Sequence, residues 1–108
     1  MSRDRESLID IEDSIELIFQ YTANVSEAEL DTNLEKQDAV LRRFIIIGEA
    51  TKRLSPEFRL QNSTIPWKKI AGMRDIVTHN YDKVDLDEVW KIIRNDLPKL
   101  LEDIKPLI

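Results

Sequence analysis

The segment from Leu34 to Leu54 constrains the fold more than any other part of the chain. Its apolar side chains fall on several neighbouring helical stripes, which contain Leu34, Val40, Leu41, Phe44, Ile45, Ile47 and Leu54. A helix with such a broad apolar surface has to bury that surface against more than one neighbour. We therefore predict a central helix of a helical bundle over residues 34–54, part of which could also serve as a subunit interface.

The N-terminal part predicts one long helix followed by a short helical turn. Apolar residues recur at three- and four-residue steps over about residues 4–22, at Leu8, Ile11, Ile15, Ile18 and Phe19. Ser26 and Glu29 have the spacing of a capping box. Because polar residues follow at 31–33, we expect only a short helical turn inside a connection.

The C-terminal half predicts two more helices. Ser55 and Pro56 end the central helix, and residues 59–64 have the composition of a polar loop. Pro66 suits the first turn of a third helix, because its missing N–H costs nothing there. This helix should run to about Tyr81, with its inward residues at Trp67, Ile70, Met73 and Val77. Trp67, like Trp90 further along the chain, is expected in the core rather than at a base-stacking surface.

The fourth helix should begin after a cap at residues 85–88 and bend at Pro98, whose ring interrupts helical hydrogen bonding. Its apolar residues are Val89, Trp90, Ile93, Leu97, Leu100, Leu101 and Ile104. Only two glycines and four prolines occur in 108 residues, which favours long helices over many short strands. We predict an all-α, up-and-down four-helix bundle with one short extra helical turn, formed as a single domain over residues 1–108.

The chain has the features of a cytoplasmic protein. Its longest apolar run, residues 44–47, is far shorter than the roughly 20 residues that span a bilayer. Its first residues are polar and lack the apolar stretch of a signal peptide. Cysteine is absent, which excludes disulfides, thiolate metal sites and cysteine nucleophiles. We expect no contact with a membrane.

Composition also limits the classes of function. With one histidine and no cysteine, a transition-metal site is not expected, and Glu57, Asp82 and Asp85 form no recognisable metal set. No glycine-rich phosphate loop occurs, so we predict no cofactor. A net charge of −5 argues against a general nucleic-acid binder. An RNA-directed activity would need a small local site or a partner.

The residues best suited to chemistry lie between Gly72 and Tyr81. His79 is the only histidine of the chain; a lone histidine most often packs or caps a helix end. Asp75 lies one helical turn before it, at a spacing that could orient the imidazole. Arg74 and Tyr81 share a stripe, whereas Arg74 and His79 are about 140° apart on an ideal helix. Arg74 and His79 can therefore converge only at the helix end or around a cleft.

The pattern Arg-x4-His-x-Tyr, formed by Arg74, His79 and Tyr81, resembles the signature of the HepT branch of the HEPN superfamily. Residues 70–73 and 82–85 on either side agree with it, and residues 46–54 resemble the family's second-helix motif. The similarity covers nearly the whole chain. It implies a homodimeric helical bundle that cleaves RNA without a metal, as the toxin of a type VII-like toxin–antitoxin system. It also implies a minimal nucleotidyltransferase antitoxin that inhibits the toxin by transferring AMP to Tyr81.

The residue types suit metal-free RNA cleavage, in which the ribose 2′-hydroxyl attacks the adjacent phosphorus. Imidazole can accept and donate a proton near neutral pH, and an arginine offers paired donors to phosphate oxygens. One chain supplies one histidine, so a two-fold dimer would be needed to bring an acid and a base together. We therefore predict Arg74 and His79 as catalytic residues of a homodimer acting on RNA.

Several alternatives remain at this stage. Glu49 could point inward and pair with an arginine such as Arg74, or be a partly exposed helix acid. Lys68 and Lys69 could contact RNA, although a solvated helix face is the simpler interpretation. Some HEPN relatives bind without cutting, so the chain could be a non-catalytic, nucleotide-binding partner subunit of a minimal nucleotidyltransferase. It could also be a helical dimerisation domain in which the motif is structural.

Overall fold

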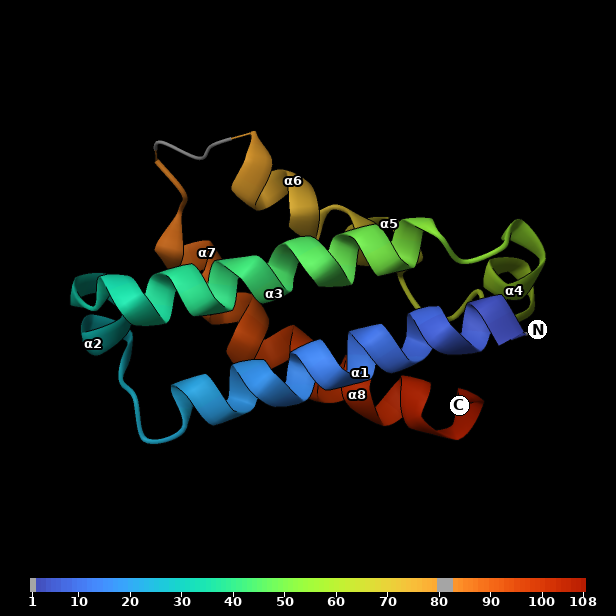
Figure 1. Cartoon of the computed structure of the whole chain (residues 1–108), viewed down its shortest axis with the longest axis horizontal. Coiled ribbons are helices and arrows are strands. Elements are labelled where there is room, and N and C mark those ends of the chain that lie inside the picture. Colours follow the sequence, from blue (N-terminus) through green and yellow to red (C-terminus); the bar gives the residue numbers. More distant parts are fainter. Residues whose placement is uncertain (1, 80–82) are drawn as a thin grey trace.

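Two long antiparallel helices form the framework of the molecule, which we describe from a computed structural model covering residues 2–79 and 83–108 (Figure 1). These are α1 (Ser2–Thr22) and α3 (Leu34–Lys52), and they pack along most of their length. The short helix α2 (Glu27–Thr32) connects them. In the described ranges every regular element is helical, which confirms the all-α fold class.

The core lies between this pair and the C-terminal helices. Its most deeply buried side chains come from both long helices and include Ile11, Ile15 and Ile18 of α1 and Phe44 and Ile47 of α3. Trp67 is also buried, as predicted. Trp90, which was also expected in the core, packs against it but is only half-buried, and the Arg94 guanidinium lies over its ring at 4.3 Å. Over the described residues, no helix is long and apolar enough to cross a membrane.

The segment after α3 departs from the predicted polar loop. Residues Pro56–Gln61 form a short helix, α4, which begins at Ser55 because the Ser55 hydroxyl accepts a hydrogen bond from the Phe58 amide. Asp4 at the start of α1 fixes this cap: its carboxylate accepts hydrogen bonds of 2.8 Å from the amide and the hydroxyl of Ser55. The Ser55 amide bond is the main reason that the pKa of Asp4 lies below its ordinary value. A helix this short has too few apolar residues for its periodicity to be recognised.

The third helix had been expected to be continuous, but it is interrupted. It is divided at Gly72 into α5 (Trp67–Ala71) and α6 (Met73–Thr78), with His79 as the C-terminal cap of α6. The four predicted inward residues, Trp67, Ile70, Met73 and Val77, are buried. Its predicted end at Tyr81 lies outside the described residues.

The fourth helix begins as predicted, with the Asp85 side chain accepting a hydrogen bond from the Glu88 amide. It consists of α7 (Leu86–Lys91), a π-helical segment η1 (Ile92–Asp96), α8 (Leu97–Ile104) and a final 3₁₀ turn η2 (Lys105–Leu107). The π segment ends two residues before Pro98, and the Leu97 amide donates a hydrogen bond back to the Ile92 carbonyl. The chain changes direction between α7 and α8 (Figure 1), in agreement with the predicted bend.

Candidate active site

Gly48 brings the central helix into backbone contact with the segment that carries the motif. A Cβ atom at Gly48 would lie 2.6 Å from Arg74 Cβ, 2.7 Å from Arg74 N and 2.9 Å from the Ala71 carbonyl oxygen. These distances are too short for any side chain, so only glycine permits this approach. The close contact places Arg74, on the first turn of α6, directly beside α3.

Arg74 lies between two carboxylates. Its Nε is 3.6 Å from Glu49 Oε2, and its Nη1 is 3.8 Å from Asp75 Oδ1. The Arg74 side chain is 38% exposed and that of Glu49 is 48% exposed. Both expectations for Glu49 therefore hold in part, because it is a partly exposed helix acid that nevertheless pairs with Arg74. It does not point into the bundle, since the bundle side of α3 is occupied by apolar residues.

Asp75 connects Arg74 to His79. Its Oδ1 lies 3.9 Å from His79 Nε2, across one helical turn. The His79 amide donates a hydrogen bond of 3.0 Å to the Asp75 carbonyl, which places the histidine at the very end of α6. The imidazole is 72% exposed. Arg74 and His79 thus converge at a helix end, one of the two arrangements that their spacing allows.

Lys52 belongs to the same group, although sequence reasoning did not assign it to the site. Its Nζ lies 3.7 Å from Asp75 Oδ1, so this one oxygen faces Lys52, Arg74 and His79. Only the spacing of Lys52 from its neighbours within α3 could have indicated that it belongs to the site. Gly48 and Glu49 lie four and three residues before Lys52, so all three are on the side of the helix that faces α6. Without knowing that Gly48 contacts α6, this side could not be recognised as part of the site.

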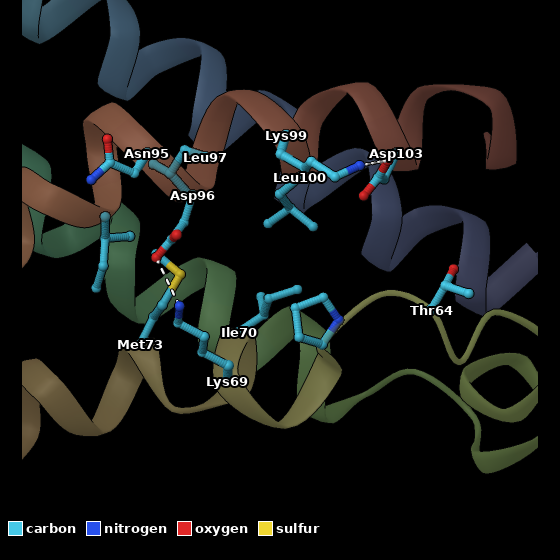
Figure 2. Close-up of a pocket in the computed structure, with 12 residues that line it drawn as sticks. Thr64, Lys69, Ile70, Met73, Asn95, Asp96, Leu97, Lys99, Leu100 and Asp103 are labelled. Atoms are coloured by element: carbon cyan, nitrogen blue, oxygen red, sulfur yellow. Dashed lines mark hydrogen bonds and ion pairs between the residues drawn. The ribbon is translucent and has the colours of Figure 1, made fainter.

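A separate cleft of about 340 Å³ lies between α5 and the η1–α8 segment (Figure 2). Ile70, Met73 and Leu100 form part of its wall, and Lys69 pairs with Asp96 at 3.2 Å. Arg74, Asp75 and His79 do not line it. Lys69 therefore forms its ion pair at this cleft rather than beside the motif.

The remaining predictions about the site concern Tyr81 and metal binding. Tyr81, the third motif residue, lies outside the described residues, as does Asp82. In the described part of the chain, no group of three or more histidine, aspartate or glutamate side chains could hold a metal ion. The donors gathered at Asp75 Oδ1 are instead nitrogen cations and an imidazole, which suit an anionic ligand.

Comparison with known proteins identifies the family. The family model described as ribonuclease HepT-like matches residues 11–107. A "probable ribonuclease HepT" of Thermococcus cleftensis is 36% identical over 96 residues, which cover 89% of this chain and 87% of the relative. A protein of Methanocaldococcus jannaschii named as an RNase is 31% identical over 104 residues, or 96% of this chain and 86% of the relative.

A second M. jannaschii protein has a name that combines a gamma-glutamylcyclotransferase with an RNase. It is 49% identical over 92 residues, which cover 85% of this chain but only 41% of that longer protein. No solved structure gives a significant match. The family model spans most of the chain and includes the Arg74–His79 segment, and the relatives named for RNase activity cover nearly all of it. The chain therefore belongs to the HepT-like ribonuclease family.

Proposed function

We propose that this protein is a metal-independent endoribonuclease with Arg74 and His79 as its catalytic residues. The observation that carries the proposal is their convergence at one carboxylate oxygen of Asp75, with the imidazole largely exposed to solvent. An exposed imidazole can reach a polymeric substrate, and the neighbouring guanidinium can hold its phosphate. Asp75 is well placed to orient the imidazole, and Glu49 to hold the guanidinium.

In the proposed reaction, the ribose 2′-oxygen forms a bond to phosphorus while the bond from phosphorus to the 5′-oxygen breaks. One imidazole accepts the proton of the 2′-hydroxyl, and a second imidazole donates a proton to the departing 5′-oxygen. Arg74 stabilises the negative charge on the phosphorane oxygens. The products are a 2′,3′-cyclic phosphate and a free 5′-hydroxyl.

The second imidazole would come from His79 of a second copy in a two-fold homodimer. Two observations support this arrangement. His79 is exposed at the end of α6, where another subunit could approach it. Leu34 lies on the same stripe of α3 as Gly48 and Lys52 and is 69% exposed. Leu41 and Ile45, which lie between Leu34 and Gly48 on this stripe, are only half-buried. This apolar stripe would favour association beside the site.

Cleavage should persist in excess EDTA and leave 2′,3′-cyclic phosphate ends, because the proposed acid, base and phosphate-binding groups are all side chains. The measurement is incubation of the purified protein with labelled single-stranded RNA of mixed sequence, followed by analysis of the product ends. Loss of cleavage on chelation, or products with 3′-hydroxyl ends, would contradict the mechanism. If the wild type cuts no RNA under any condition, the ribonuclease proposal fails and the non-catalytic alternative, which the net charge of −5 favours, takes its place.

We also propose that the protein acts as a toxin whose partner, a minimal nucleotidyltransferase antitoxin, transfers AMP to Tyr81. Tyr81 follows His79 by two residues, so an attached AMP would lie close to the site, where its phosphate could pair with Arg74 as an RNA phosphate would. Mass spectrometry after co-expression with the nucleotidyltransferase should show AMP-sized additions on Tyr81, and Tyr81→Phe should prevent inhibition. Additions on another residue, or inhibition that persists in Tyr81→Phe, would disprove this mode of regulation.

A further inference from the structure

We propose that Lys52 is a phosphate-binding residue of the same site, which contacts the RNA phosphate together with Arg74 and His79. The proposal rests on the ribonuclease function above and extends it to a residue outside the Arg-x4-His-x-Tyr pattern. Lys52 lies on the last turn of α3, whereas Arg74 and His79 lie on α6. Its ammonium reaches the group from a different element and faces the same Asp75 oxygen, at 3.7 Å.

The lengths of the ion pairs distinguish this group from the others in the described part of the chain. Away from the site, Arg53–Asp10, Lys91–Asp87 and Lys99–Asp103 lie at 3.1 Å, and Lys69–Asp96 lies at 3.2 Å. These are hydrogen-bonding distances. At the site, the four contacts measure 3.6 to 3.9 Å. Such contacts provide attraction without a good hydrogen bond.

The donors of Lys52, Arg74 and His79 are therefore gathered around Asp75 but not saturated by it. A phosphodiester has two non-bridging oxygens that accept short, charge-assisted hydrogen bonds from such donors. Since the Lys52 side chain is 45% exposed, its ammonium is accessible from solvent. An RNA phosphate could bind Lys52 and Arg74, with the His79 imidazole beside it, without first breaking a strong ion pair.

The charge balance of the group gives Lys52 a specific role. Glu49 and Asp75 carry two negative charges, and Arg74 alone offsets only one of them. With Lys52 the group is neutral when the imidazole is uncharged and positive when it is protonated. Without Lys52 it would be negative when the imidazole is uncharged and would repel a phosphate, in a protein whose net charge is already −5. Lys52 thus makes the site compatible with an anionic substrate.

The first experiment uses inorganic phosphate and does not depend on cleavage. His79 is the only histidine, so the imidazole C–H signals in an NMR spectrum belong to one known residue. Phosphate should shift these signals in the wild type, and Lys52→Gln should weaken the apparent affinity about tenfold. Lys99→Gln is the matched control, because it removes the same charge from a lysine paired with Asp103 on α8. It should behave like the wild type.

The second experiment measures RNA cleavage by the same variants. Lys52→Gln should lower kcat/KM about ten- to a hundredfold, with reduced dependence of RNA affinity on salt, whereas Lys99→Gln should change neither. Wild-type values for Lys52→Gln in both experiments, or equal losses in the two variants, would overturn the assignment of Lys52. So would the absence of any phosphate-induced shift in the wild type. If the phosphate result holds but no RNA is cut, Lys52 binds an anion and only the ribonuclease proposal fails.

Discussion

Replacement of His79 by alanine should lower the rate of RNA cleavage by about 10²- to 10⁴-fold, the usual contribution of a general acid or base. In a homodimer the substitution removes both imidazoles at once, so the loss should lie toward the upper end of this range. The fold should be preserved, because the side chain is 72% exposed and the cap of α6 is made by the His79 backbone N–H, which alanine retains. The measurement is single-turnover cleavage of labelled RNA, with thermal unfolding as the control for folding. A variant that retains more than about a tenth of the wild-type rate would exclude His79 as acid or base.

The same substitution also tests whether two subunits share one site. A mixed dimer with Arg74→Ala in one subunit and His79→Ala in the other would retain one arginine and one histidine in the shared cleft. Because the proposed reaction needs both an acid and a base, this mixed dimer should be strongly impaired. Full activity of the mixed dimer, or an active monomer in solution, would contradict the composite site.

Gly48→Ala should lower the free energy of unfolding by about 1–3 kcal/mol and also impair cleavage. The added Cβ would meet Arg74 Cβ at 2.6 Å, and it would meet the backbone of Arg74 and Ala71 at 2.7 and 2.9 Å. Neither backbone atom can move away unless the α5–α6 segment separates from α3. That movement would displace Arg74 from Glu49 and Asp75 from Lys52, so stability and activity should fall together.

Gly72→Ala is the matched control for this prediction. A Cβ at Gly72 would lie 3.2 Å from the Lys69 carbonyl oxygen and 3.5 Å from that of Lys68, and the backbone there is right-handed helical. Alanine should therefore need only a small adjustment at this position, and the change in stability should stay within about 1 kcal/mol. Urea unfolding of both variants provides the comparison. Equal stability of Gly48→Ala and the wild type would show that the contact between α3 and α6 does not depend on glycine.

Several helices and one contact within the motif could be predicted from the sequence because they depend on local patterns. Apolar periodicity located α1 and α3, and the capping residues Ser26 and Asp85 marked the starts of α2 and α7. Pro98 indicated the change of direction before α8. The spacing of Asp75 and His79 predicted their contact across one helical turn. Each of these features requires only residues that are near one another in the chain.

The tertiary structure decided which groups meet, because distances between elements are not encoded in the periodicity of either element. The predicted third helix is divided at Gly72, and α4 forms where a loop had been expected, with Asp4, 51 residues away, fixing its cap. Lys52 joins the site only because Gly48 has no side chain, so that the backbones of α3 and α6 can approach closely there. Periodicity reports which face of a helix is buried. How closely two helices approach, and which side chains then share one carboxylate oxygen, depends on steric fit between residues far apart in the chain.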